Sequence, residues 1–349
     1  MYLRNQTRAV NIGGVTVGGN SPVSIQSMTN TKTADIKSTV QQIHLLERAG
    51  CEIIRVTVPD MESALAIKEI KKQISIPLIA DIHFDYRLAL ECIKNGIDKI
   101  RLNPGNIGGC ERVAEVAKAA KERGIPIRIG VNSGSVDKEL LKKYGFPTPD
   151  AIVESAFKHI NMLWDNDFGD IVVSLKTSDV VTTIEAYKKF AEQSDIPLHV
   201  GVTEAGTIRT GSIKSAVGIG SILSQGIGNT VRVSLTGDPV EEVRIASQIL
   251  KSLDLKPRGV NIISCPTCGR TNVDLPAIAN AVETALEGVQ RNITVAVMGC
   301  AVNGPGEARE ADYGVACGKG EGLLFKNGET VKKVAESEII SALLELINE

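Results

Sequence analysis

The feature that most constrains the fold is a regular alternation of apolar strand candidates with helix-period segments along most of the chain. Eight segments have the composition of strands: Val23–Met28, Glu52–Val58, Pro77–His83, Asp98–Asn103, Ile125–Asn132, Asp170–Lys176, Pro197–Glu204 and Asn229–Leu235. Helical periodicity lies between them, for example in Asp35–Ala49, Met61–Lys72 and Glu111–Arg123. Eight β-α repeats predict an α/β fold, a (β/α)8 TIM barrel rather than an open sheet, with Val10–Gly19 as a hairpin before the first strand.

A second domain is predicted after the last barrel helix, Pro239–Leu253. The polar stretch Asp254–Gly259 is the natural boundary, so we expect a barrel domain over residues 1–253 and a small α+β domain over residues 259–349. The elements expected in the second domain are strands at Val260–Ser264 and Ile293–Met298, helices at Leu275–Glu287 and near Val334–Ile347, and short strands around Tyr313–Ala316 and Leu323–Lys326.

Composition excludes several classes of protein. The 349 residues carry 39 Lys and Arg against 41 Asp and Glu, which argues against a general polyanion binder but not against a local basic pocket. Aromatic residues make up 3%, too few for a row of base-stacking platforms. No stretch approaches the ~18 apolar residues of a membrane span, and no signal-peptide core opens the chain, so we expect a soluble cytoplasmic protein.

Polar side chains of matching parity gather at the carboxyl ends of six of the eight strands. Because side chains alternate along a strand, the two members of each pair point the same way. The pairs are Arg55 and Thr57, Asp81 and His83, Arg101 and Asn103, Arg128 and Asn132, Ser174 and Lys176, and Arg232 and Ser234. Barrel enzymes perform their chemistry at this end of the strands.

Five bases converging on one barrel mouth need anionic partners. Arginine forks match phosphate oxygens, so the pattern predicts a small substrate with more than one phosphate group. The alternative is that some of these bases only pair with acids such as Asp81 and Glu204. Glu204 follows Thr203 at the end of the seventh strand, where it is a candidate proton donor or holder of a substrate hydroxyl, or else a structural ion-pair partner.

Two further residues have alternative roles. His83 is either an acid or base, or a hydrogen-bonding wall residue. Lys176 pairs with phosphate or forms a Schiff base, as in barrel aldolases.

The seven cysteines are unevenly placed. Cys51, Cys92 and Cys110 are scattered and are interpreted as buried apolar residues. Cys265 and Cys268 form a Cys-x2-Cys directly after a strand, and Cys300 follows the next predicted strand. This grouping predicts a metal site, and because only one Cys-x2-Cys is present, an iron–sulfur cluster fits better than a zinc ribbon. Spacing alone favours Cys317 as the fourth ligand, with Glu307 as the other candidate.

These motifs resemble a known family. The eight-strand barrel with its arginines, the segment Ser264–Arg270 (SCPTCGR) and the segment Met298–Glu307 (MGCAVNGPGE) are similar to bacterial 4-hydroxy-3-methylbut-2-enyl diphosphate synthases of the non-mevalonate isoprenoid pathway. The resemblance covers essentially the whole chain.

The resemblance implies a reaction and a cofactor. The substrate is 2-C-methyl-D-erythritol 2,4-cyclodiphosphate, whose ring is opened and whose C3 hydroxyl is removed with two electrons. A [4Fe–4S] cluster carries the electrons from reduced flavodoxin or ferredoxin. Carried over to this sequence, the cluster ligands are Cys265, Cys268, Cys300 and Glu307, in a module similar to that of sulfite and nitrite reductases, so Cys317 loses its role.

The resemblance also implies roles in the barrel. Arg55, Arg101, Arg128, Lys176 and Arg232 would hold the diphosphate. Glu204 would protonate or orient the C3 oxygen. Hydrogen bonds to hydroxyl and phosphate oxygens would come from Asn103, Asn132, Thr203 and Ser234, with Asp81 and His83 beside them.

The family forms a homodimer in which the cluster of one chain covers the barrel mouth of the other. The length of the linker agrees with this arrangement. The last barrel helix, Pro239–Leu253, ends on the side of the barrel opposite its mouth, and the six residues Asp254–Gly259 that follow it reach only about 20 Å.

Two other classes of protein are compatible with parts of the pattern. One is a Schiff-base barrel lyase acting through Lys176 with a structural zinc. The other is a zinc-ribbon nucleic-acid module fused to a barrel, which is disfavoured because no basic patch with aromatic residues surrounds Cys265–Cys317.

Overall fold

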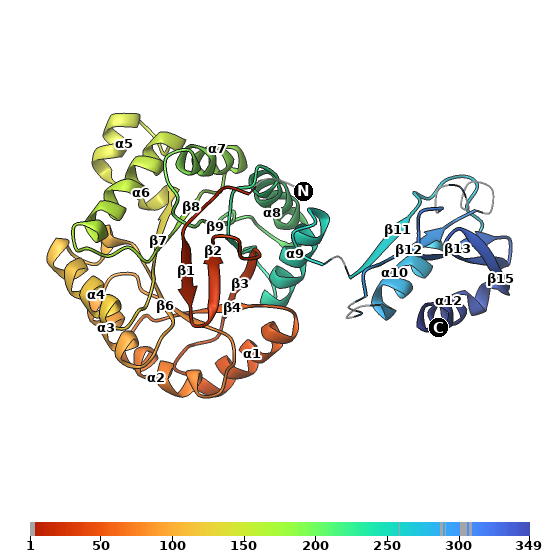
Figure 1. Cartoon of the computed structure of the whole chain (residues 1–349), viewed down its shortest axis with the longest axis horizontal. Coiled ribbons are helices and arrows are strands. Elements are labelled where there is room, and N and C mark those ends of the chain that lie inside the picture. The colour runs from red at the N-terminus through yellow and green to blue at the C-terminus, as the bar shows by residue number, and fades with distance from the viewer. Residues whose placement is uncertain (1–3, 258, 287–288, 290, 301–305, 307–308) are drawn as a thin grey trace. The chain divides into compact units, whose positions relative to one another are not determined.

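The computed structural model describes residues 4–257, 259–286, 289, 291–300, 306 and 309–349 (Figure 1). The chain divides into two compact units, Met1–Lys256 and Pro257–Glu349. Each unit has a hydrophobic core of its own. No helix among these residues is long and apolar enough to cross a membrane.

The first unit is built on a parallel eight-stranded sheet. Its strands are β3 (Ser24–Met28), β4 (Ile53–Thr57), β5 (Leu78–Asp81), β6 (Lys99–Leu102), β7 (Ile127–Asn132), β8 (Ile171–Lys176), β9 (His199–Val200) and β10 (Thr230–Val231). They pair in the order β8-β7-β6-β5-β4-β3-β10-β9. A bridge between Val173 and Leu198 joins β8 to the residue before β9 and brings the two ends of the sheet together. The predicted TIM barrel is confirmed.

Helices surround this sheet (Figure 1). They are α1 (Ile36–Arg48), α2 (Met61–Lys71), α3 (Tyr86–Lys94), α4 (Cys110–Glu122), α5 (Lys138–Tyr144), α6 (Pro149–Trp164), α7 (Val180–Ala191), α8 (Ile208–Ser224) and α9 (Pro239–Ser252), with short 3-10 turns η1 (Pro104–Asn106) and η2 (Ser133–Ser135). An aspartate carboxylate accepts from a backbone N–H at the first turn of several of them, as Asp35 does for α1 and Asp60 for α2. These caps fix where each loop of the barrel mouth ends.

An antiparallel hairpin closes the end of the barrel that lies opposite its mouth. Strands β1 (Ala9–Ile12) and β2 (Val15–Gly18) lie at the centre of the ring of helices in Figure 1. Their buried side chains Val10, Ile12 and Val17 pack against the first inward-facing residues of β4, β5 and β8, which are Ile53, Ile79 and Val172. The hairpin expected over Val10–Gly19 is therefore present, and it seals the amino-terminal end of the strands with apolar side chains.

The second unit is a five-stranded mixed sheet with helices. Its elements are β11 (Val260–Ser264), α10 (Leu275–Ala285), β12 (Ile293–Met298), β13 (Tyr313–Gly318), β14 (Glu321–Lys326), β15 (Glu329–Ala335), η3 (Glu336–Glu338) and α12 (Ile339–Asn348). Strands β11, β12 and β13 are parallel, and β13, β14 and β15 form an antiparallel meander. The expected α+β domain is confirmed.

Some elements differ from the sequence-based expectations. β9 and β10 have two residues each, much shorter than Pro197–Glu204 and Asn229–Leu235. The last helix begins at Ile339, because Val334 and Ala335 belong to β15. β15 was missed because it is a polar strand at the edge of the sheet, exposed along most of its length. Its signal is the turn Asn327–Gly328, where both residues have positive φ.

Candidate active site

Inward-facing side chains of the barrel form successive levels. The pairing registers relate each strand to the next around the barrel. Because the strands are tilted in this fold, each level contains one residue from every second strand. We call four of them the lower floor (Ile53, Lys99, Val172, Thr230), the upper floor (Gln26, Ile79, Arg128, His199), the arginine level (Arg55, Arg101, Ser174, Arg232) and the glycine level (Met28, Asp81, Gly130, Gly201). Above the glycine level, Thr57, Asn103, Lys176 and Ser234 face the mouth.

Asp81 is the anionic centre of the predicted cationic site. Its carboxylate lies 2.9 Å from Arg101 Nη1 and 3.6 Å from Arg55 Nε. Burial by itself would raise the pKa of Asp81, but the charges of Arg55 and Arg101 outweigh it and lower the pKa to about 2. The pKa of Arg55 falls to about 10, chiefly because this side chain is buried. Asp81 is therefore ionised and orients two arginines.

Arg232 and Arg128 have weaker partners. Arg232 Nη2 lies 3.4 Å from a carboxylate oxygen of Glu242, a buried residue of α9. Arg128 Nη1 donates to Ser174 Oγ at 3.4 Å, and burial followed by the charges of Arg55 and Arg101 lowers its pKa well below the ordinary value. The interpretation that these bases only pair with acids holds for part of the set, and Arg128 has no carboxylate within ion-pair distance among the described residues.

Two glycines make room for long cationic side chains. A Cβ on Gly130 would lie 2.9 Å from Arg101 Nε. A Cβ on Gly201 would lie 2.6 Å from Lys176 Nζ and would also collide with the carbonyl oxygen of Arg232. Both contacts are closer than side chains tolerate, so the glycine level is hollow where Arg101 and Lys176 pass through it.

We expect Gly130→Ala to weaken substrate binding strongly while the protein remains folded, because the new methyl group meets only side-chain atoms of Arg101. It displaces the Arg101 guanidinium, and losing one charged hydrogen bond costs about 1.5–3 kcal/mol. Isothermal titration with inorganic pyrophosphate measures the change. Gly220→Ala on α8, where a Cβ meets no neighbour, is the matched control. Equal affinity in the two variants would contradict this account.

The remaining predicted residues lie around the mouth. Lys176 is buried, and its burial, followed by Arg128 and Arg232, lowers its pKa well below the ordinary value. Asn103 accepts from Gly105 N and so shapes the loop after β6, while Arg101 Nη1 donates to His83 Nε2 at 3.3 Å. Asn132, the last residue of β7, is half-buried, and so are Thr203 and Ser234, which lie three residues beyond β9 and β10.

Glu204 is exposed in the loop after β9, and its backbone has φ +52°. A left-handed backbone at a residue other than glycine is strained, and such strain is typical of functional loops.

The cysteines of the second unit lie at the ends of two adjacent parallel strands. Cys265 follows β11, and its Sγ accepts a hydrogen bond from the backbone of Gly299, just after β12, at 3.3 Å. Cys268 is exposed, and hydrogen bonds from the backbone and side chain of Arg270 and from Thr271 lower the pKa of its thiol. Cys300 follows Gly299 directly, whereas Glu307 lies outside the described residues.

The three side chains have the chemistry that an iron–sulfur cluster requires of its ligands. All three are thiols near one end of a sheet, and the lowered pKa of Cys268 favours its thiolate form. Within the described ranges, no three His, Cys, Asp or Glu side chains are already grouped to hold a metal.

Cys317, the fourth ligand favoured by spacing, is fully buried in the core of the second unit. Burial, followed by the negative charge of Glu336, raises the pKa of its thiol to about 11. It behaves as an apolar residue. Cys51 and Cys92 are also buried, whereas Cys110, interpreted as buried from the sequence, is exposed at the first turn of α4.

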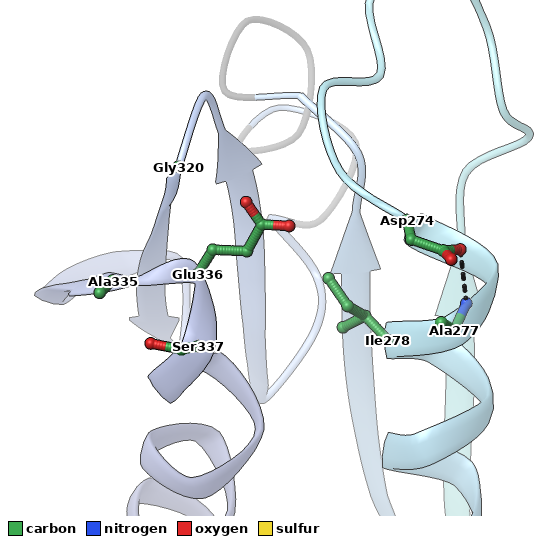
Figure 2. Close-up of a pocket in the computed structure, with 7 residues that line it drawn as sticks. All are labelled: Asp274, Ala277, Ile278, Gly320, Ala335, Glu336 and Ser337. Atoms are coloured by element: carbon green, nitrogen blue, oxygen red, sulfur yellow. Dashed lines mark hydrogen bonds between the residues drawn. The ribbon is translucent and has the colours of Figure 1, made fainter.

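A surface pocket of the second unit is of a different kind. Figure 2 shows Glu336 and Ile278 facing each other across it, with Asp274 accepting from Ala277 N at the start of α10. The described residues that line this pocket include two carboxylates and no lysine or arginine. It does not suit a polyanion, and the barrel mouth does.

Comparison with family models agrees with both units. Residues 7–247 match the GcpE TIM-barrel domain, and residues 261–349 match the GcpE protein C-terminal domain. The chain belongs to the GcpE family. The two matches together cover nearly all of the chain.

Similar curated proteins carry one enzyme name, 4-hydroxy-3-methylbut-2-en-1-yl diphosphate synthase (flavodoxin). That of Ruminiclostridium cellulolyticum is 59% identical over 346 residues, covering 99% of this chain and 98% of the relative. That of Geobacillus kaustophilus is 61% identical over 340 residues, covering 97% of this chain and 91% of the relative.

Solved structures share the barrel fold alone. 3-Dehydroquinate dehydratase from Geobacillus kaustophilus has a TM-score of 0.50 and 14% identity over 72% of this chain and 99% of that chain. Phospho-2-dehydro-3-deoxyheptonate aldolase from Thermotoga maritima has a TM-score of 0.50 and 8% identity over 71% of this chain and 73% of that chain.

Several residues of the site were missed from the sequence. Lys99 and His199 have the same parity as predicted residues of their own strands and could have been found by extending the parity rule toward the strand starts. Gly130 and Gly201 could also have been found, as glycines at inward-facing positions. Glu242 lies on a helix, where strand parity gives no signal.

Proposed function

We propose that this protein is a 4-hydroxy-3-methylbut-2-enyl diphosphate synthase of the methylerythritol phosphate pathway of isoprenoid biosynthesis. It opens the ring of 2-C-methyl-D-erythritol 2,4-cyclodiphosphate and removes the C3 hydroxyl in a two-electron reduction, in which the C3 oxygen leaves as water. The observation that carries the proposal is the excess of inward-facing cations around Asp81 in the barrel of a GcpE-family chain.

The arginine level and Lys176 bind the diphosphate. Asp81 and Glu242 hold Arg55, Arg101 and Arg232 in place, so these cations are oriented before the substrate arrives. In the empty site these cations repel one another. When the diphosphate binds, charged hydrogen bonds to its phosphate oxygens offset that repulsion. Hydrogen bonds from Asn103, Asn132, Thr203 and Ser234 select the orientation of the sugar-derived hydroxyls.

Glu204 stands at the mouth, exposed on its strained loop. Its carboxylic acid donates a proton to, or its carboxylate orients, the departing C3 oxygen. His83, which accepts from Arg101, is a wall residue that keeps this arginine directed toward the substrate.

The electron-carrying group would be a [4Fe–4S] cluster, which Cys265, Cys268, Cys300 and Glu307 would hold and which would supply single electrons for the reduction. Thiolates are strong ligands of iron, and a carboxylate is a weaker, displaceable fourth ligand. The electron donor is reduced flavodoxin or ferredoxin, the enzyme acts in the cytoplasm, and two copies of the chain form a homodimer with shared sites.

Anaerobically purified protein should be brown, with broad absorption near ~400 nm and roughly four irons per chain, because thiolate-to-iron charge transfer absorbs there. Iron and sulfide analysis with an absorption spectrum measures this. A colourless protein with one zinc per chain after anaerobic reconstitution would overturn the reductase proposal.

The alternative of a Schiff-base lyase has one observation in its favour, since the lowered pKa of Lys176 favours a neutral amine. The relatives named as synthases count against it. Borohydride trapping of substrate on Lys176 would support the lyase and exclude the reductase.

We expect Arg128→Met and Arg232→Met to weaken substrate binding and to leave the absorption spectrum unchanged. Each lost charged hydrogen bond to phosphate costs about 1.5–3 kcal/mol. Titration with substrate measures the affinity, and Arg244→Met on the exposed side of α9 is the matched control. Wild-type affinity in both barrel variants would mean that the diphosphate binds elsewhere.

A further inference from the structure

The floor of the barrel is polar where branched aliphatic side chains usually pack. Gln26, Arg128 and His199 share the upper floor with one isoleucine, and Lys99 and Thr230 lie in the lower floor. All five side chains are at most 2% exposed. The β1–β2 hairpin seals this region from below with Val10, Ile12 and Val17.

Most polar atoms of the floor have no partner in the described part of the chain. The unpartnered atoms include Lys99 Nζ, Arg128 Nε, both ring nitrogens of His199, both amide atoms of Gln26 and Thr230 Oγ1. A buried polar group without a partner costs free energy, and a buried unpaired charge costs more. A change in the protonation state of these side chains is therefore a direct way to lower this cost.

The charges that face Lys99 are all positive. Arg128 on β7 and Arg55 on β4 act on it, and His199 on β9 feels Lys99 in turn, together with Lys176. Thr230 on β10 and Gln26 on β3 are neutral. The carboxylates that pair with arginines of the site lie higher in the barrel. Glu242 holds Arg232 two levels above Lys99, and Asp81, three levels above Lys99, holds Arg55 and Arg101.

A lysine can relieve this repulsion by losing its proton, whereas an arginine remains protonated. Burial, followed by the charges of Arg128 and Arg55, lowers the pKa of Lys99 well below its ordinary value. His199 is buried among the same cations, and its pKa is also well below the ordinary value, so its ring is neutral near pH 7.

We propose that Lys99 is a further determinant of polyanion binding: its amine is neutral while the mouth is empty and takes up one proton from solvent when a diphosphate binds among the arginines above it. The inference rests on the proposed function, which puts a diphosphate at that level. In this step an N–H bond forms on Lys99 while hydronium or a buffer acid gives up the proton, and no oxidation state changes. The floor thereby adds a positive charge without touching the substrate.

The sign of the pH dependence follows. Binding raises the pKa of the Lys99 ammonium, so polyanion affinity is highest at low pH and falls as pH rises through the window between its free and bound pKa. The fall is about tenfold per pH unit for each coupled proton.

The test uses anaerobically purified, cluster-loaded enzyme and inorganic pyrophosphate. Titration calorimetry between pH 6 and 9, in buffers of different ionisation heat, measures protons taken up per pyrophosphate bound. We expect Lys99→Met to take up fewer protons than wild type, by up to one per chain, and its affinity to vary less steeply with pH. The titration of pyrophosphate itself is the same in both proteins and cancels. Lys68→Met, on the exposed face of α2, should match wild type.

A second measurement does not depend on the variant. Sulfate keeps its charge across this pH range, so any proton uptake when it binds to wild type comes from the protein. Equal uptake in wild type and Lys99→Met, or no uptake with sulfate, would overturn the proposal and would fit a floor that is permanently charged around a resident small anion. Failure of the proposed function gives a different result: pyrophosphate affinity that Arg232→Met does not change.

Discussion

Replacing Cys265, Cys268 or Cys300 by alanine is expected to abolish both bound iron and turnover, whereas Cys317→Ala keeps the cluster and most activity. In the proposed ligand set each of the first three supplies a thiolate, and its loss would leave one iron without that strong ligand. Cys317 is different because it is fully buried and its thiol has a pKa of about 11. Glu307→Ala should weaken cluster retention or stop turnover.

Iron content, the absorption band and activity of anaerobically purified variants measure these effects together. Cys317→Ala is the matched control, since it removes a thiol from the same sheet. Replacing this buried cysteine by the smaller alanine should lower the free energy of unfolding only modestly. Loss of the cluster in Cys317→Ala combined with full activity in Glu307→Ala would reverse the assignment of the fourth ligand.

The barrel was predictable because its signals are local. Each strand is an apolar run, each helix has its own period, and an aspartate caps several helix starts. The short strands β9 and β10 show the limit of that reasoning. An apolar run predicts extended chain, but ladder pairing ends where the chain turns into the mouth loops.

The candidate site was predictable where strand parity decides it. Parity identified Arg55, Asp81 and Arg101, which the structure brings into contact. It could not identify Glu242, which reaches Arg232 from a helix, because that contact depends on how α9 packs on the sheet. The candidate ligands Cys265, Cys268 and Cys300 were predicted from their spacing and from a family resemblance, and the fourth candidate, Glu307, lies outside the described residues.

We propose that each active site is formed by two copies of the chain. In the proposed function the barrel supplies cations for the substrate and the second unit supplies thiols for the cluster, so neither unit would perform the reduction alone. Lys256 at the end of the first unit pairs with Glu52, which directly precedes β4. The chain therefore leaves the barrel at the end opposite its mouth.

From Lys256 to Cys265 an extended chain spans only about 30 Å. A return to its own mouth must first follow the length of α9, about 21 Å for its 14 residues, and then cross the ring of helices. A two-fold dimer that gives each barrel the cluster of the other copy avoids this path.

Co-expression of two defective variants should therefore restore activity at a substrate concentration where each variant alone turns over little. One variant carries Arg232→Met in the barrel, and the other carries Cys300→Ala in the cluster unit. A mixed dimer has one intact site, formed by the barrel of the Cys300→Ala chain and the cluster of the Arg232→Met chain. With random pairing about half of the dimers are mixed, so about a quarter of all sites should work.

Differential affinity tags isolate the mixed dimers, and their turnover is compared with wild type. Co-expression of Arg232→Met with Arg128→Met is the matched control, because both chains then have a defective barrel and no pairing yields an intact site. If the site were formed within one chain, every chain in the first experiment would also carry a defect. Isolated mixed dimers of Arg232→Met and Cys300→Ala without activity would thus exclude the cross-chain site, whereas recovery confined to that pair requires each cluster to serve the barrel of the other copy.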